Sequence, residues 1–208
     1  EAVSLIQRHD LSSPLFLVMA LNAPAHYAAV PQALSDPYRK VGDDSRRNYL
    51  AAVSGVDLAV GQVVAALESR DLLSNTVIVF HSDNGGAVPM RFATGDGDVR
   101  NAAADNGAFR EGKGSLYEGG VRAAALLHWP GRIKPKSVVT EALHVTDINV
   151  TLRNLAGAMA DTEQRTDGLD AWPAIANRQL TPHKELLVNV DDFHGAIRVG
   201  ETAEGLES

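Results

Sequence analysis

The sequence predicts an α/β fold in which helices flank a mostly parallel β-sheet, and three consecutive elements predict it. Residues 14–21 (PLFLVMAL) form a short apolar run that is typical of a strand buried on both faces. From residue 45 to residue 70, apolar side chains recur at spacings of three and four, which favours a long amphipathic helix. A second apolar run at 75–82 (NTVIVFHS) predicts the next strand. A strand, a helix and a strand in this order form a right-handed parallel βαβ unit in nearly all known cases.

The remaining elements are expected to be shorter. We expect strands at 122–129 (RAAALLHW) and 185–190 (ELLVNV), and a helix at 145–158. Residues 87–111 lack any periodicity and contain many small residues, which indicates a long loop. The expected N-cap of the long helix is one of three polar residues, Asp43, Asp44 or Ser45. A length of 208 residues suits one domain, so we expect a single domain over 1–208.

The composition excludes several classes of partner and site. Hydrophobic residues make up 45% of the chain and charged residues 22%, values typical of globular proteins. A net charge of −7 disfavours nucleic acid, whose phosphates need a basic surface. No apolar run approaches the roughly 20 residues that a membrane span requires, so no membrane partner is expected. The absence of Cys excludes disulfides, thiolate zinc sites and a cysteine nucleophile.

Asp83 and Asn84 follow the predicted strand at 75–82 and are candidate metal ligands. A carboxylate and a carboxamide oxygen suit Ca²⁺ or Mg²⁺ better than zinc. Two glycines come next and allow the backbone to approach a ligand closely. Because loops at the carboxyl ends of parallel strands share one edge of the sheet, we expect this loop and the loop containing His26 to face one site. The alternative is a plain Asx turn after a strand.

Three cations between Arg110 and Arg122 form a second candidate site. Lys113 lies between two glycines, so its backbone can come close to a ligand. In an acidic chain such a cluster indicates an anionic substrate group, such as sulfate or phosphate. The alternative is a solvated loop in which these cations pair with the glutamates of the same segment.

Histidine offers one further candidate for catalysis. His26 lies in the loop after the first predicted strand and could donate a hydrogen bond or a proton to a leaving oxygen. The other histidines discussed are expected to be packing or surface residues: His81, His128, His144, His183 and His194.

Five segments in order carry a resemblance to a known family: NTVIVFHSDNGG, GKGSLYEGGVR, HWPGRI, LHVTDINVTLRNLAGA and DGLDAWPAI. In sequence and spacing the chain resembles the arylsulfatase-type sulfatases of the alkaline-phosphatase superfamily, from Pro14 to about Val199. The resemblance implies an alkaline-phosphatase-like fold and the hydrolysis of sulfate esters. It also implies that Asp83 and Asn84 ligate an active-site Ca²⁺ and that Lys113 binds the sulfate oxygens.

The chain also departs from the family. The family has His directly after Ala-Pro in the first loop, whereas Ala25 stands there and His26 follows. The family converts a Cys or Ser in a Cys/Ser-x-Pro-x-Arg segment to the nucleophile formylglycine, and it uses paired Asp ligands on its first strand. We expect this nucleophile and these ligands to be missing, so formylglycine is not available in the chain.

The chain therefore resembles the middle and later part of a sulfatase catalytic domain, with the fold incomplete. By itself we expect it to be inactive, and to need the N-terminal part of the enzyme or a second copy as a partner. Two alternatives stay open, a non-catalytic remnant of the fold and a related phosphate or phosphonate ester hydrolase. Family members are secreted, periplasmic or lysosomal, and the sequence does not choose between these compartments.

Overall fold

The computed structural model describes residues 1–24, 30–88, 103–158, 166–188 and 195–199. The chain divides into two compact units, Glu1–Trp129 and Pro130–Ser208. The expectation of a single domain over 1–208 stays a prediction.

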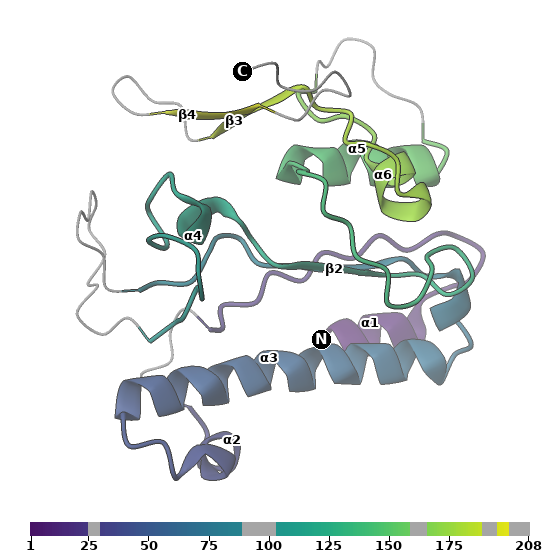
Figure 1. Ribbon diagram of the computed structural model, residues 1–208. Helices are drawn as coiled ribbons and strands as arrows, with labels where there is room; N and C mark the ends of the chain where they lie inside the picture. The colour runs from purple at the N-terminus through teal and green to yellow at the C-terminus, as the bar shows by residue number, and fades with distance from the viewer. Residues whose placement is uncertain (25–29, 89–102, 159–165, 189–194, 200–208) are drawn as a thin grey trace. The chain divides into compact units, whose positions relative to one another are not determined.

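The first unit combines helices with one two-stranded sheet (Figure 1). Its α-helices are α1 (Ala2–Arg8), α2 (Gln32–Ser35), α3 (Asp44–Glu68) and α4 (Glu118–Val121). Two 3-10 helices, η1 (Asp36–Tyr38) and η2 (Leu73–Asn75), precede and follow α3. The strands are β1 (Ile78–His81) and β2 (Ala125–His128). The predicted long helix and the predicted strands at 75–82 and 122–129 are thus confirmed, although each strand is shorter than its apolar run.

Helix α3 begins where the sequence places its cap. The side chain of Asp43 accepts a hydrogen bond of 2.8 Å from the backbone N–H of Arg46, which satisfies one of the free donors of the first turn. At the other end, Ala66 and Leu67 are buried with Ile6 of α1 in the core of the unit. Arg70 closes this core, because its guanidinium donates to three carbonyl oxygens at the end of α1, those of Ile6, Gln7 and His9.

By length and composition alone, α3 could also cross a membrane. An 18-residue window of this helix is apolar enough to span a membrane, although the helix also contains Asp57. The core helix of a soluble protein passes the same test, so this observation is weak. The expectation of no membrane partner stays a prediction.

The pairing of β1 with β2 is antiparallel, with Ile78 opposite His128 and His81 opposite Ala125. Both sheets that the described residues form are antiparallel pairs, so the mostly parallel sheet is not found among them. The described chain also has no strand at 14–21. A strand needs backbone hydrogen bonds from a neighbour, and residues 14–21 receive none from the described part of the chain. Leu17 packs against the core, whereas Phe16 and Val18 are 77% and 73% exposed.

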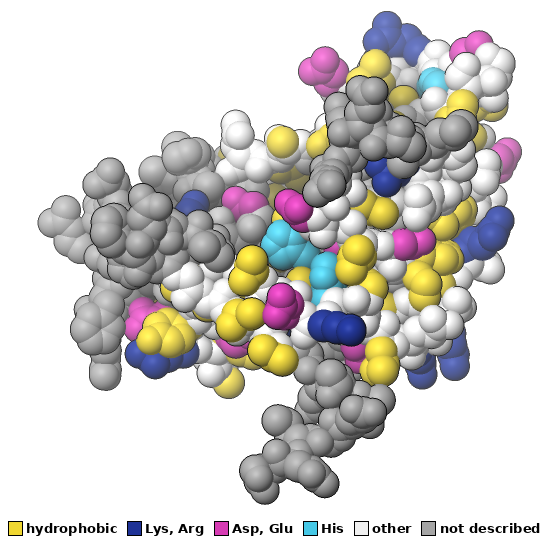
Figure 2. Space-filling model, turned by 90° about the horizontal axis from the view of Figure 1, so that it is seen from above, with side chains coloured by type: hydrophobic (Ala, Val, Ile, Leu, Met, Phe, Trp, Pro, Cys, Tyr) yellow, Lys and Arg dark blue, Asp and Glu magenta, His cyan; other side chains and the backbone are white. Residues whose placement is uncertain are grey.

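Exposed apolar side chains are not confined to that segment. Figure 2 shows hydrophobic side chains spread over the visible face, between charged and polar ones. Scattered exposed apolar residues are ordinary in a soluble protein. The run at 15–21 differs because most of its large apolar side chains are exposed together.

The second unit contains α5 (Val145–Leu155), α6 (Trp172–Asn177) and the antiparallel pair β3 (Glu185–Val188) and β4 (Ala196–Val199). The predicted helix at 145–158 is confirmed, and the predicted strand at 185–190 is confirmed over 185–188, beyond which its residues lie outside the described part of the chain. A capping box starts α5: the His144 ring accepts from the backbone of Thr146, and Asp147 Oδ2 accepts from the backbone N–H of His144 at 2.7 Å. After α5, Gly157 takes a φ of +66°, a left-handed conformation that suits the end of a helix.

Buried side chains hold the second unit together. Asp147 is only 1% exposed, and its carboxylate accepts hydrogen bonds from the backbone N–H of Leu169 at 2.8 Å and from the ring of His183 at 2.8 Å. Thr151 is also buried and accepts a bond of 2.9 Å from the backbone N–H of Ala171. The expectation that His144 and His183 are packing residues therefore agrees with their contacts in this unit.

Candidate functional site

The candidate site lies where β1 ends and β2 begins. Beyond the strands the antiparallel pairing continues, with Ser82 N donating to Ala124 O at 2.9 Å and Gly85 N to Gly120 O at 2.8 Å. Lys113 N then donates to Gly86 O at 3.1 Å. The loop of Asp83 and the loop of Lys113 are therefore neighbours. This proximity comes from antiparallel pairing, which carries the chain before β2 past the chain after β1. The expected shared edge of parallel strands stays a prediction.

Glycines make this close approach possible. A Cβ atom on Gly85 would lie 1.8 Å from Gly119 O, and one on Gly119 would lie 2.0 Å from Glu111 O. A Cβ on Gly120 would lie 2.4 Å from Ser115 O. Any side chain at these positions would collide with backbone, which cannot move aside cheaply. The glycines at 85, 119 and 120 are therefore explained by close contact between three backbone segments, which lie at 85, 111–115 and 119–120.

Asp83 and Asn84 form a short polar turn on the surface. Asp83 Oδ1 accepts from the backbone N–H of Asn84 at 3.0 Å, and Asn84 Nδ2 donates to Gly85 O at 2.8 Å. Both bonds join a side chain to the next residue, whereas the side-chain bond of an Asx turn reaches the backbone two residues on. Among the described residues, no hydrogen bond reaches Asp83 Oδ2 or Asn84 Oδ1. Two hard oxygen atoms thus remain available for a cation.

The oxygen ligands of this pair suit Ca²⁺, but the pair provides too few of them for a complete site. Ca²⁺ takes six to eight oxygen ligands, whereas the pair offers one carboxylate and one carboxamide. The described residues contain no group of three or more His, Asp or Glu side chains that could hold a metal. The pair is therefore suited to be part of a calcium site whose other ligands come from elsewhere.

Lys113 is exposed and its backbone is fixed. Its N–H bonds to Gly86 O at 3.1 Å, and the preceding Gly112 is buried. No carboxylate in the described part of the chain forms an ion pair with Lys113. A cation on a fixed backbone is well placed to bind an anion.

Arg110 and Arg122 both have aromatic partners. The Arg110 guanidinium carbon lies 3.7 Å from the centroid of the Tyr117 ring, and that of Arg122 lies 4.7 Å from the centroid of Phe109. Arg122 also pairs with Glu118 at 3.2 Å. These contacts stabilise the loop itself. The predicted role of both arginines in substrate binding stays a prediction.

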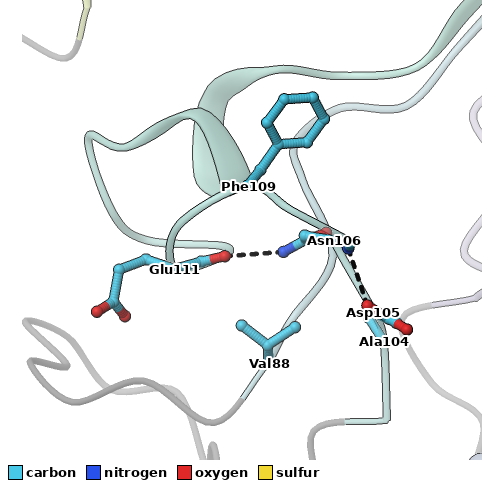
Figure 3. Close-up of a pocket in the computed structure, with 7 residues that line it drawn as sticks. Val88, Ala104, Asp105, Asn106, Phe109 and Glu111 are labelled. Atoms are coloured by element: carbon cyan, nitrogen blue, oxygen red, sulfur yellow. Dashed lines mark hydrogen bonds between the residues drawn. The ribbon is translucent and has the colours of Figure 1, made fainter.

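A pocket of about 290 Å³ lies beside the Lys113 loop (Figure 3). Its walls come from seven residues: Val88, Ala104, Asp105, Asn106, Gly107, Phe109 and Glu111. Glu111 takes a φ of +60°, an uncommon conformation for a residue with a side chain, which costs roughly 1–3 kcal/mol unless its surroundings hold it. Sequence reasoning missed Asn106 at this pocket. A signal existed, because Asp105-Asn106-Gly107 repeats the Asp-Asn-Gly order found at Asp83.

His26 and His194 lie outside the described residues. The expectation that the chain lacks a Cys/Ser-x-Pro-x-Arg segment is wrong for Ser, because Ser35-Asp36-Pro37-Tyr38-Arg39 has that spacing. Ser35 is the last residue of α2, and its hydroxyl donates to Gln32 O at 3.0 Å, within the same helical turn.

The comparison with known families adds to this geometry. Residues 1–158 match the family described as Sulfatase. The chain is 31% identical to mouse arylsulfatase J over 97% of its length, and 33% identical to dog N-acetylgalactosamine-6-sulfatase over 87%. It spans about a third of the length of these relatives, 32% in both cases.

A solved structure shows the same likeness in three dimensions. The crystal structure of Ps i-CgsB in complex with k-i-k-neocarrahexaose superposes with a TM-score of 0.81 at 30% sequence identity. The match covers 96% of this chain and 43% of that one.

Proposed function

Because the chain belongs to the sulfatase family, we propose that it forms part of the active site of a Ca²⁺-dependent sulfuric ester hydrolase of the arylsulfatase type. One observation carries this proposal beyond family membership: the hydrogen bond from Lys113 N to Gly86 O joins the loop that carries the cation to the turn of Asp83 and Asn84. An anion and a divalent cation could thus be held beside each other.

Each residue in the proposal has a separate task. The free oxygens of Asp83 and Asn84 hold Ca²⁺, with Mg²⁺ as the other hard cation that suits them. The bound ion supplies Lewis-acid stabilisation of charge on the sulfate oxygens. Lys113 binds those oxygens through its ammonium group and offsets their charge as the ester bond breaks. His26 donates a proton to the leaving oxygen.

The rest of the site comes from outside this chain in the proposal. A site with two ligands needs at least four more, from other protein segments or from water. Because the Ser35 hydroxyl is bonded to Gln32 O within its own helical turn, the proposal takes the nucleophile, formylglycine in this family, from another segment. The partners are accordingly a sulfate ester substrate and the N-terminal part of the enzyme, or a second copy of the chain.

The same proposal gives residues 14–21 a structural role. In the whole protein, this segment is a strand of a mostly parallel sheet of the alkaline-phosphatase type. Its exposed apolar side chains support this, because a sheet covered on both faces would bury Phe16 and Val18.

The test separates metal binding from substrate binding in the full-length protein. Asp83→Ala should lower both calcium content, measured by elemental analysis, and hydrolysis of a chromogenic aryl sulfate. Lys113→Ala should lower turnover by roughly 100- to 1,000-fold with calcium content unchanged, because its cation serves the sulfate. Lys40→Ala, an exposed lysine at the end of η1, is the matched control and should change neither value.

Two results would contradict the proposal. One is loss of calcium from the Lys113 variant, which would show that the two tasks are not separate. The other is a wild-type protein that hydrolyses phosphate esters and not sulfate esters. The 208-residue chain alone should show no multiple turnovers. Its mass should also show no loss of two hydrogens at Ser35, the change that conversion to formylglycine would produce.

A further inference from the structure

The side chain of Asn106 joins the two loops of the candidate site. Its Oδ1 accepts a hydrogen bond from Gly86 N at 2.9 Å, and its Nδ2 donates to Gly86 O at 3.0 Å. The second Nδ2 proton goes to Glu111 O at 3.0 Å, a contact drawn in Figure 3. The carboxamide thus uses both donors and its acceptor on the backbones of two segments, 83–86 and 111–113.

Two glycines leave room for this carboxamide. A Cβ atom on Gly86 would lie 2.9 Å from Asn106 Oδ1 and 2.5 Å from the Cβ of Ala104. A Cβ on Gly112 would lie 3.1 Å from Asn106 Nδ2 and 2.3 Å from Gly86 O. A side chain at either glycine would therefore crowd the carboxamide of Asn106, which lies between the two loops.

The bonds of Asn106 share an atom with the bond that fixes Lys113. Gly86 O accepts from Asn106 Nδ2 and also from Lys113 N at 3.1 Å. Gly86 lies two residues after Asn84, and Glu111 lies two residues before Lys113. A shift of the Asn106 side chain would therefore change the position of the turn of Asp83 and Asn84 relative to Lys113.

We infer that Asn106 is a positioning residue, which holds the turn of Asp83 and Asn84 at a fixed distance from Lys113. This inference rests on the proposed sulfatase function for its kinetic consequence, and on the hydrogen bonds alone for its structural one. Asparagine suits the task because aspartate has the same shape but no donors. Glutamine has the same groups on a side chain that is one methylene longer.

The experiment compares Asn106→Asp and Asn106→Ala with wild type in the full-length protein. Hydrogen exchange of the peptides that contain Gly86 and Lys113 should become about tenfold faster in both variants, because the loops open more often. With a chromogenic aryl sulfate, kcat should fall about 100-fold, the scale of effect that a small misplacement of catalytic groups produces. KM should change far less.

A matched control separates positioning from stability. Thr151→Val removes a buried hydrogen bond of 2.9 Å to the backbone of Ala171 in the second unit, and should lower the unfolding temperature. It should leave kcat per folded molecule and the exchange of the two site peptides unchanged.

The outcomes decide the inference in either direction. Faster exchange with a reduced kcat in both Asn106 variants supports it. Wild-type exchange and kcat in Asn106→Asp would overturn it, because the side chain would then only fill space. If wild type does not hydrolyse sulfate esters, the proposed function fails, while the exchange measurement still decides whether Asn106 holds the two loops.

Discussion

The two units of the chain hold their polar regions in opposite ways. In the first unit, the loops after β1 and before β2 are joined by backbone hydrogen bonds between glycines, and the side chains of Asp83 and Lys113 are exposed. In the second unit, the carboxylate of Asp147 and the hydroxyl of Thr151 are buried and accept hydrogen bonds from backbone N–H groups.

The difference teaches which polar residues are available for chemistry. A buried carboxylate with all its bonds made inside the protein stabilises a fold and cannot bind a ligand without losing those bonds. A loop held by its backbone keeps its side chains free. By this criterion Asp83 and Lys113 are candidates for function, whereas the Asp147–His183 pair is structural in spite of its resemblance to a catalytic dyad.

Gly85→Ala should have the largest effect, because the added Cβ would lie 1.8 Å from Gly119 O. We expect a loss of more than about 5 kcal/mol in the free energy of unfolding, or no folded protein at all. Gly61→Ala is the control, since a Cβ there would meet nothing within 4 Å and lies in a helix. It should stabilise by about 0.5–1 kcal/mol. Urea unfolding measures both. A Gly85 variant as stable as wild type would refute the close backbone contact.

Asp147→Ala should have the second largest effect on stability. It removes the acceptor for the backbone N–H groups of His144 and Leu169 and for the ring of His183, so three donors lose a buried acceptor. We expect a loss of about 3–5 kcal/mol in unfolding free energy. Asn154→Ala removes only an exposed bond of 3.1 Å to Asp170 and should stay within about 0.5 kcal/mol of wild type. Similar losses in the two variants would mean that burial does not distinguish these polar groups.

Arg122→Ala should have a small effect on stability. Its guanidinium is exposed and interacts with Phe109 and Glu118, contacts that together stabilise by about 0.5–1 kcal/mol. The thermal unfolding midpoint measures this loss. The KM for an aryl sulfate in the same variant tests the predicted substrate role, and an unchanged KM would remove Arg122 from the substrate site.

Asp10 should give the smallest effect, because it is a fully exposed carboxylate. The pKa of Asp10 lies below its ordinary value because the hydroxyl of Ser12 donates to it at 2.5 Å and the backbone N–H of Ser12 at 3.0 Å. The stability that this shift contributes is therefore present above the ordinary pKa and is lost as pH falls through the folded pKa. An NMR titration of the Asp10 carboxyl measures the shift, and Ser12→Ala should raise the pKa toward its ordinary value. No change in Ser12→Ala would assign the shift to another cause.

Much of the fold could be predicted from sequence because local patterns determine it. The spacing of apolar residues located α3 and α5, and the three candidate caps of α3 included the observed one, Asp43. Apolar runs located β1, β2 and β3. The strand at 14–21 was not found in the described structure, because a strand depends on a partner and an apolar run cannot specify one.

The candidate site was predictable in its parts. Asp83, Asn84 and Lys113 were identified as candidates by residue type and by the glycines beside them, and the roles predicted for them stay predictions. Asn106 was missed, although Asp105-Asn106-Gly107 repeats the Asp-Asn-Gly order found at Asp83, because this order does not show which backbone groups the side chain contacts. Its side chain bonds to backbone groups 20 and 5 residues away, and no local spacing encodes such a contact.

The sequence by itself therefore determined α3 and α5, the strands β1, β2 and β3, the family resemblance and the candidate residues for chemistry, because each depends on side-chain type and local spacing. Only the tertiary structure decided the direction of strand pairing, which places the Lys113 loop against Gly86. It also decided that Asp147 and His183 are buried together, and that the glycines of the site are required by backbone contact. These features depend on which distant segments meet, and hydrogen bonds between distant backbones leave little trace in residue types.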